Sequence, residues 1–547
     1  MSSLRLRVPA IVTLLAALIL IVVWSSGDSI RQVRVIESSL IVGGASAILL
    51  FWFVFASDAP KRARMSVGAA VGLLMVTGAG LFRIRGVSGD LVPILEFRFA
   101  APRALPEADT QTPLVNAANP SSALPSPDSA APGLLATSKT PAALPSMTDP
   151  GSTPAPNGGV DHLDWPQYLG PSRSGAVPDA GLAADWSAQP PRLLWRQPIG
   201  AGWAGFAVSG DIAITQEQRG GEERVIAYDL KTGRPRWSHA DQASHDSPLG
   251  GIGPRAVPAI DRGQVFALGA TGILNALSAS DGRLLWSRNI LRDSGAAEPE
   301  WGVAVSPLVR GSRVIVSAGG TSGKSLIAYD RETGDPAWMN GRGGLAYSSP
   351  VVLNLGGRDQ IVILNRGSVA GHDPENGAAL WEQDFPNGQP NVAPPLALSA
   401  NRVLFSVGYG IGSKVFEISR GEPLAARLVW STPRLKSKFA NMVAYQGSVY
   451  GLDDGVMVCL DPESGERRWK SGRYGHGQLI LAGKRLLVQT EEGEVVMIDP
   501  SPERLIEVTR FQALSGKTWN PPALATPILL VRNDLEAAAY ELPVLRP

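Results

Sequence analysis

The chain has 547 residues, and its 50 basic and 49 acidic side chains leave a formal net charge of only +1. This balance lacks the concentrated basic surface that nucleic-acid binding requires, so we expect no nucleic-acid partner. The single cysteine, Cys459, excludes an intrachain disulfide framework and a multi-cysteine metal site. Sixty glycines, 44 prolines and 14 tryptophans suit short strands joined by tight turns better than long helices.

Three apolar runs open the chain, at residues 8–24, 39–56 and 65–82. Each has about 17 or 18 residues, near the lower limit for a helix that crosses a bilayer. The first run alone could be a secretory signal. Two further runs, and no small-residue cleavage site after Trp24, favour a retained membrane anchor over residues 1–100.

Basic residues near the runs predict the orientation of this anchor. Arg5 and Arg7 precede the first run, and Lys61, Arg62 and Arg64 separate the second from the third. Short loops rich in Lys and Arg stay in the cytoplasm. With three crossings, we expect a bacterial inner-membrane protein whose remaining chain lies in the periplasm, whereas an even number of spans would reverse this.

Two segments of different composition follow the anchor's apolar runs. Residues 83–100 are short and mixed, and we expect them to lie against the membrane surface. Residues 101–160 consist largely of Pro, Ala, Ser and Thr, with almost no aromatic side chain. Such a segment cannot bury enough apolar surface to offset its ordering entropy, which predicts a disordered, extended linker whose role is reach.

A folded domain is expected over residues 161–547, because a single motif recurs there. CLDPESGERRW (459–469) has close copies in AYDLKTGRPRW (227–237), ALSASDGRLLW (276–286), AYDRETGDPAW (328–338) and GHDPENGAALW (371–381). The glycine takes the positive φ of a bulged hairpin turn, and the tryptophan packs against the neighbouring repeat. We therefore assign a structural docking role to Trp195, Trp237, Trp286, Trp338, Trp381, Trp430 and Trp469.

The spacing of these tryptophans predicts the fold. From Trp237 to Trp469 they stand about 39 to 52 residues apart, which is the length of one propeller blade. We expect an all-β, eight-bladed β-propeller with four-stranded antiparallel blades. The eighth sheet, from Trp519 to the C-terminus, has only three strands, and RLLWRQPIG (192–200) supplies the fourth and closes the ring.

This repeat resembles the tryptophan-docking motif of the quinoprotein family, and the resemblance covers residues 164–547. WPQYLGPSRSG (165–175) and residues 438–499 resemble most closely the pyrroloquinoline-quinone-like (PQQ-like) repeat proteins, in particular their non-catalytic outer-membrane-assembly (BamB-like) branch. The resemblance implies a binding or assembly scaffold whose loops dock envelope proteins.

The same family implies an alternative, a PQQ- and calcium-dependent alcohol or sugar dehydrogenase that passes electrons to membrane quinone. Many alcohol-oxidising members carry a pair of adjacent cysteines, and this chain has one cysteine. No local motif places a calcium-binding set or a catalytic aspartate. We therefore assign no catalytic residue and no metal ligand, and we favour the scaffold.

The residues that open each inner strand of a propeller face its central channel. Here they include aromatic rings together with arginine, lysine and histidine, which could stack on and hydrogen-bond a planar anionic ligand. They serve equally well as fillers of a solvated channel mouth, and we prefer that interpretation. These candidate cofactor-binding residues are Trp203, Arg255, Trp301, Tyr347, Asn391, Lys438, Asn441, His476, Trp519 and Asn520.

Three other features carry weaker signals. SHADQASHDS (238–247) gathers His and Asp, but its spacing matches no established metal site, and we expect a solvated surface loop. AGGTSGKS (318–325) superficially resembles a phosphate-binding loop, yet a strand follows it, which predicts a hairpin. Cys459 occupies an apolar strand position and is expected to be a buried, inert thiol.

Overall fold

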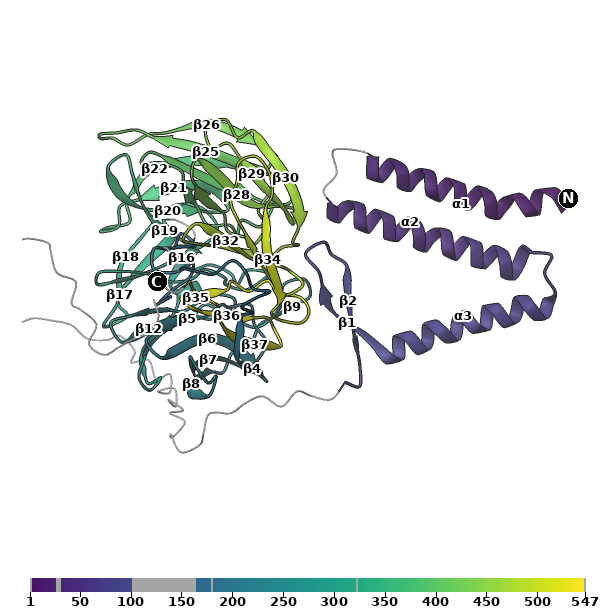
Figure 1. Ribbon diagram of the computed structural model, residues 1–547, viewed down its shortest axis with the longest axis horizontal. Coiled ribbons are helices and arrows are strands. Elements are labelled where there is room, and N and C mark those ends of the chain that lie inside the picture. Colours follow the sequence, from purple (N-terminus) through teal and green to yellow (C-terminus); the bar gives the residue numbers. More distant parts are fainter. Residues whose placement is uncertain (1, 26–30, 101–163, 179–180, 321–322, 546–547) are drawn as a thin grey trace, which may run out of the picture.

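The computed structural model describes residues 2–25, 31–100, 164–178, 181–320 and 323–545. Three helices stand to one side, a two-stranded hairpin follows them, and a propeller forms the main body (Figure 1). The predicted linker, residues 101–160, lies outside the described residues. The description below therefore concerns the helices, the hairpin and the propeller.

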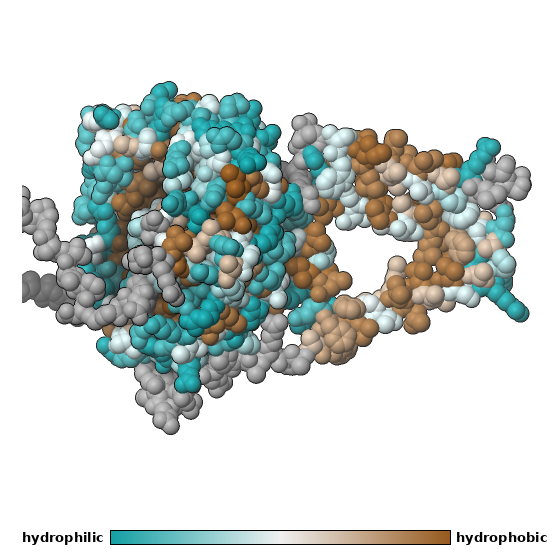
Figure 2. Space-filling view, in the orientation of Figure 1, coloured by the Kyte–Doolittle hydropathy of each residue, from teal (hydrophilic) through white to brown (hydrophobic). Residues whose placement is uncertain are grey.

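The three helices are α1 (Ser2–Ser25), α2 (Arg31–Phe51), which continues into a π-helical turn (Trp52–Ala56), and α3 (Lys61–Leu81). All three are long and apolar enough to cross a membrane, over Arg7–Ser25, Gln32–Ala56 and Lys61–Leu81. The second and third begin earlier than predicted, because both helices take in polar residues at their N-termini. Hydrophobic side chains cover much of their surface (Figure 2).

A hairpin leads directly from the last helix to the propeller. Strand β1 (Phe82–Val87) starts at the residue after α3 and pairs antiparallel with β2 (Pro93–Phe97). We expected residues 83–100 to lie against the membrane surface. Instead the two strands satisfy each other's backbone hydrogen bonds and extend to the propeller (Figure 1), where the loop of residues 88–92 makes contact.

The described residues form eight four-stranded antiparallel blades, in agreement with the prediction. Blade 1 is β5 (Ala207–Ser209), β6 (Ile212–Arg219), β7 (Glu222–Asp229) and β8 (Pro235–Asp241). Blade 2 is β11 (Ala259–Asp261), β12 (Gln264–Leu268), β13 (Ile273–Ser278) and β14 (Leu284–Asn289). Blade 3 is β15 (Leu308–Arg310), β16 (Arg313–Gly320), β17 (Lys324–Asp330) and β18 (Pro336–Asn340). Blade 4 is β19 (Val351–Leu355), β20 (Arg358–Leu364), β21 (Gly367–His372) and β22 (Ala379–Phe385).

The remaining blades follow in chain order. Blade 5 is β23 (Leu396–Ala397), β24 (Arg402–Val407), β25 (Gly412–Ile418) and β26 (Ala426–Thr432). Blade 6 is β27 (Val443–Tyr445), β28 (Ser448–Asp453), β29 (Val456–Leu460) and β30 (Arg467–Arg473). Blade 7 is β31 (Gln478–Ala482), β32 (Arg485–Gln489), β33 (Glu494–Ile498) and β34 (Glu507–Gln512). Blade 8 is β35 (Ala523–Ala525), β36 (Ile528–Arg532), β37 (Glu536–Glu541) and β4 (Arg192–Pro198).

The ring closes as predicted. Strand β4 pairs antiparallel with β37, with Trp195 opposite Ala539, so the last blade takes its outer strand from the start of the domain. A feature that we did not predict is β3 (Ala176–Val177), which adds a parallel fifth strand to blade 7 beside β31. A small sheet of β9 (Asp246–Ser247) and β10 (Gly251–Ile252) and a short helix, α4 (Ile290–Ser294), lie between blades.

Most docking tryptophans reach the turn of the next blade, and the core lies between these neighbouring sheets. The indole N–H of Trp237 donates to the carbonyl of Ala279 at 2.9 Å, and its ring covers Gly282. A Cβ built on Gly282 would lie 2.5 Å from that ring, and the φ of +72° also favours glycine. Equivalent indole bonds join Trp195 to Leu230, Trp286 to Arg331, Trp430 to Pro462 and Trp469 to Ser501.

Two tryptophans depart from this geometry. Trp381 donates to Oε1 of Gln360 in its own blade, because the following blade has an irregular turn in place of the motif. Trp338 stacks on Gly377, but its buried indole nitrogen has no hydrogen-bond partner among the described residues. Both tryptophans therefore keep the packing of the ring but lack the indole hydrogen bond to the turn of the next blade.

Candidate functional site

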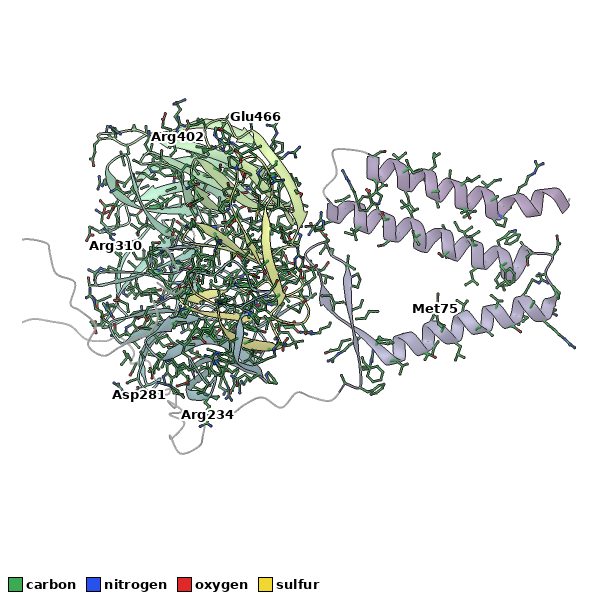
Figure 3. The ribbon with its side chains drawn as sticks, in the orientation of Figure 1. Met75, Arg234, Asp281, Arg310, Arg402 and Glu466 are labelled. Carbon is green, nitrogen blue, oxygen red and sulfur yellow. The ribbon has the colours of Figure 1, made fainter. Side chains whose placement is uncertain are left out.

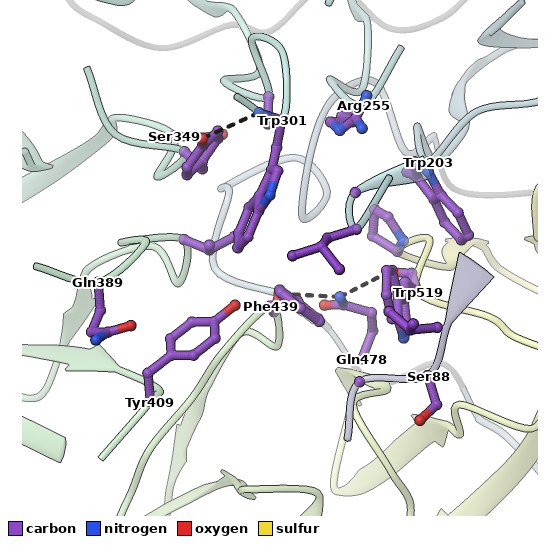
Figure 4. Close-up of a pocket in the computed structure, with 18 of the residues that line it drawn as sticks. Ser88, Trp203, Arg255, Trp301, Ser349, Gln389, Tyr409, Phe439, Gln478 and Trp519 are labelled. Carbon is purple, nitrogen blue, oxygen red and sulfur yellow. Dashed lines mark hydrogen bonds between the residues drawn. The ribbon is translucent and has the colours of Figure 1, made fainter. Parts of the chain in front are cut away.

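The segments that precede the inner strands converge on a cavity at the centre of the propeller. Its volume is about 370 Å³, within the range of small-molecule sites. Seven aromatic side chains form much of the wall: Tyr168, Trp203, Trp301, Tyr347, Tyr409, Phe439 and Trp519. Figure 4 labels Trp203, Trp301, Tyr409, Phe439 and Trp519 among them. The cavity is thus mainly apolar and enclosed by rigid side chains.

The tip of the β1–β2 hairpin forms one end of the cavity. Val87, Ser88, Gly89 and Leu91 contribute to the wall, together with Gln32 from α2. The backbone N–H of Gly89 donates to Oε1 of Glu491 at 2.5 Å. The carbonyl of Gly89 accepts from Nζ of Lys438 at 3.1 Å and from Nε2 of Gln32 at 2.7 Å. These three bonds, which we call the clasp, fix the membrane-proximal segment to the channel mouth.

The clasp requires glycine at its centre. A Cβ on Gly89 would lie 1.9 Å from Cδ2 of His476, which no real contact allows. The ring of His476 is itself held in place, because its backbone N–H donates to Glu491 and its Nε2 lies 3.4 Å from Oδ1 of Asp90. The mouth is therefore shaped around the bare backbone of the hairpin tip.

Lysine side chains at the mouth also serve the hairpin. Nζ of Lys517 donates to the carbonyl of Val87 at 3.1 Å and lies 4.1 Å from the ring centre of Trp519. Burial lowers the pKa of Lys517 to about 8 and also lowers the pKa of Lys438. An ion pair between Arg85 of β1 and Asp534 joins the hairpin to blade 8.

The segment of residues 164–177 closes the other end of the channel. Trp165 pairs with Val208 in the middle of β5, and Tyr168 lines the cavity. Arg173 donates to the carbonyls of Ser306 and Pro307 at 3.1 and 2.8 Å. Burial lowers the pKa of Arg173 to about 10 and raises that of Tyr168 to about 12. We expected order to return at this segment, but not that it would cross the channel.

The structure divides the ten candidate channel residues into three groups. Trp203, Arg255, Trp301, Tyr347 and Trp519 line the cavity. Lys438 and His476 contact the hairpin tip instead. The three asparagines are absent from the cavity wall and bond to backbone: Asn391 to Asn365, Asn441 to Leu479, and Asn520 to Gly202 and Ala204.

Several lining residues escaped the sequence analysis. Phe439 directly follows Lys438, so its place before an inner strand was a usable signal. Tyr409 comes from the loop between β24 and β25, and Tyr168 from the crossing segment, where no repeat pattern marks them. The hairpin residues were missed because they precede the repeats altogether.

The cavity wall does not supply the carboxylates that a calcium site usually needs. None of its lining residues is Asp or Glu, and calcium takes oxygen ligands that usually include carboxylates. Glu491 stands near the mouth, but it already accepts from Gly89, His476 and the indole of Trp519. Within the described ranges, no three His, Cys, Asp or Glu side chains are grouped to hold a metal. We therefore derive no redox step through this site.

The loop of residues 238–247 is not the solvated segment that we expected. His239 and His245 are only 4% and 7% exposed. Nδ1 of His245 lies 2.7 Å from Oε1 of Glu298, because the insertion between blades 1 and 2 folds against the insertion that follows blade 2. Glu298 gives the buried imidazole of His245 a hydrogen-bond partner, and these two side chains are too few for a metal site.

The other two weak features behave as predicted. The described parts of residues 318–325 belong to the hairpin of β16 and β17, with Gly320 opposite Lys324. Cys459 is fully buried, and burial raises the pKa of its thiol.

Eight four-stranded blades, locked by indoles that dock on the next blade's turn, define this protein as a PQQ-like β-propeller. The family model described as outer membrane protein assembly factor BamB matches residues 172–304 and 297–471, more than half of the chain. The chain belongs to this family.

Individual relatives are more distant. BamB of Shewanella oneidensis is 25% identical over 297 residues, which cover 50% of this chain and 67% of that protein. BamB of Xanthomonas campestris is 35% identical over 127 residues, 22% of this chain and 28% of that protein. The quinohemoprotein alcohol dehydrogenase of Comamonas testosteroni aligns with a TM-score of 0.50 and 14% identity, over 70% of this chain and 81% of that chain. This last likeness concerns the fold alone.

Proposed function

We propose that this protein is a membrane-anchored propeller scaffold that binds envelope proteins during outer-membrane assembly. Membership of the BamB family supports the scaffold role, since the relatives are named as assembly factors. The clasp is the observation that carries the anchoring, because it joins the segment leaving α3 to the propeller through the backbone of Gly89. The three apolar helices then hold the propeller at the membrane.

In this arrangement the propeller sits with its channel mouth toward the membrane. The hairpin contacts Lys438 and His476, which precede inner strands. The blade edges and docking turns would then face partners.

The orientation follows from the basic residues near the helices. Arg7 precedes the first span, and Lys61, Arg62 and Arg64 stand at the start of α3. The positive-inside rule then puts the propeller in the periplasm of an inner membrane. Protease added to intact spheroplasts should cleave the propeller and spare the loop between α2 and α3. Cleavage only after lysis would reverse the orientation.

A deletion strain tests the scaffold role. We expect lower amounts of outer-membrane β-barrel proteins and greater detergent sensitivity, both restored by the wild-type chain. Unchanged β-barrel protein levels would contradict the assembly function. The full chain should also be titrated with PQQ and calcium. Submicromolar binding with dye-linked oxidation of an alcohol or aldose would replace the scaffold by a dehydrogenase.

A further inference from the structure

A guanidinium without a carboxylate partner and two indole donors without acceptors lie on one stretch of the cavity wall. The guanidinium of Arg255 donates to the backbone carbonyls of Gly251 and Gly253. It forms no ion pair with a carboxylate in the part of the chain that the structure describes. The guanidinium of Arg255 is poorly solvated, and its burial lowers its pKa to about 10. A buried cation of this kind normally has an anionic partner.

The other two donors are indole N–H groups. The Nε1 atoms of Trp203 and Trp301 are buried, and neither has a hydrogen-bond partner among the described residues. Most tryptophans of the repeat do find a carbonyl, as Trp237 and Trp286 show. A buried donor that lacks an acceptor destabilises the fold, and a bound ligand is one of the few explanations for it.

These three groups lie close to one another. A Cβ built on Gly250 would be 2.9 Å from Nη2 of Arg255 and 3.2 Å from Cδ1 of Trp301. A Cβ built on the next residue, Gly251, would be 2.9 Å from Nε1 of Trp203. Figure 4 shows Arg255 at the cavity edge between the two indoles. One cation and two neutral donors around one spot suit a single oxyanion with several acceptor sites.

The rest of the wall is uncharged and mostly apolar, with a few serine and glutamine side chains. Leu91, Leu249, Val392, Phe439 and Trp519 surround the remaining space, and the lining set includes no carboxylate that would repel an anion. Arg255 is the only cationic side chain among the lining residues. It balances one negative charge of a ligand, and a second negative charge would have no partner. The ligand that fits has one anionic end and an uncharged hydrophobic body.

We propose that the cavity binds an amphipathic monocarboxylate, with its carboxylate on Arg255 and the indoles of Trp203 and Trp301 and its apolar body against Phe439 and Trp519. Gln32 of α2 and the hairpin tip complete the wall, and Leu249 at the same wall is 44% exposed. The mouth therefore opens toward the helices that anchor the chain. Binding of such a ligand does not depend on which proteins the scaffold recruits.

The test uses the full chain in lipid nanodiscs and 11-(dansylamino)undecanoic acid as the probe. Tryptophan-sensitised dansyl emission, with the signal of empty nanodiscs subtracted, reports binding next to the cavity indoles. We expect saturable binding at micromolar concentration. The methyl ester of the same probe keeps the apolar body and loses the charge, and it should bind at least tenfold more weakly.

Matched arginine variants separate the site from general effects. Arg255→Met should weaken binding of the acid at least tenfold and leave the ester within twofold. Arg234→Met is the control, because Arg234 is exposed on the docking turn between β7 and β8, at the outer edge of the propeller (Figure 3), and does not line the cavity. Trp301→Phe removes one donor with little change of shape and should weaken the acid about threefold to fivefold, which tests the site even if Arg255→Met fails to fold.

Competition distinguishes the two sources of such a ligand. Displacement of the probe by dodecanoate supports a membrane-derived chain, displacement by 2-naphthoate supports a soluble aromatic acid, and either result supports the site. Equal affinity for acid and ester, equal behaviour of the Arg255 and Arg234 variants, or no saturable binding would overturn the proposal. None of these results bears on the deletion phenotype, so the scaffold function is tested separately.

Discussion

Replacing Gly89 with alanine should release the hairpin from the propeller. The new Cβ would lie 1.9 Å from Cδ2 of His476, whereas ordinary contacts begin at 3.4 Å, so the tip must retreat by about 1.5 Å. The bonds from Gly89 to Glu491, Lys438 and Gln32 are 2.5, 3.1 and 2.7 Å long and cannot stretch that far.

The energy at stake follows from those bonds. Two of them involve a charged side chain and contribute about 1.5–3 kcal/mol each, and the third contributes about 0.5–1.5 kcal/mol. Loss of about half of this sum, roughly 2.8 kcal/mol, lowers the ratio of docked to undocked hairpin about 100-fold. The blades share no strand with the hairpin, so the melting temperature of the propeller should hardly change.

Cross-linking in membranes measures the docked fraction. Arg85→Cys and Asp534→Cys replace an ion pair between the hairpin and blade 8, and a short bismaleimide joins them when the hairpin is docked. An engineered protease site within residues 101–163 then separates the two parts on a gel unless they are cross-linked. We expect strong cross-linking in the Gly89 background and little with Gly89→Ala.

Gly86→Ala is the matched control in the same hairpin, since a Cβ there would meet only Nζ of Lys517 at 3.5 Å. It should cross-link as the parent does. If Gly89→Ala also cross-links at the parent rate, the clasp does not hold the hairpin, and the argument for anchoring through it fails.

Three further predictions concern the blades. Trp286→Phe loses the indole bond to Arg331, whereas Trp338→Phe loses no hydrogen bond, so urea unfolding should show the first to be more destabilising by about 1 kcal/mol; equal losses would contradict the docking geometry. The hydrogen bond from Arg468 lowers the pKa of Asp461, so this carboxylate stabilises the fold above its unfolded pKa near ~3.9 and loses that effect as the pH falls through its lower folded pKa. Melting temperatures should therefore drop below about pH 4, less steeply in Asp461→Asn, and parallel curves would refute the assignment. Cys459 should react with Ellman's reagent only after unfolding, because it is fully buried and its thiol pKa is raised; fast reaction of the native protein would also invalidate the cross-linking design.

The sequence was sufficient for the propeller because the information that specifies a blade is local and repeated. A glycine that needs positive φ and a tryptophan four residues later mark each turn, so the spacing of Trp237, Trp286 and their counterparts gave the blade number. The last blade had only three strands and required a fourth, which the segment around Trp195 supplied from before the first repeat. The repeat does not determine the indole hydrogen bonds of Trp338 and Trp381, because these depend on the turn that follows.

The sequence predicted only part of the cavity wall. Position before an inner strand correctly brought Trp203, Arg255, Trp301, Tyr347 and Trp519 to the cavity wall. The same rule failed for the three asparagines, because it gives no side-chain direction. Asn391, Asn441 and Asn520 turn to neighbouring backbone, whose buried N–H and C=O groups need partners.

The sequence alone determined that this chain carries apolar helices and a propeller of repeated sheets. Only the tertiary structure decided that the two are clasped together and that segments outside the repeats lie at both ends of the channel. Gly89 and Glu491 are 402 positions apart in the sequence, and Arg173 and Pro307 are 134 positions apart. Neither segment belongs to the repeat, so no periodic pattern could pair them. Contacts of this kind depend on complementary shape and on backbone N–H and C=O groups. Because every residue carries these backbone groups, such contacts produce no recognisable pattern in the sequence.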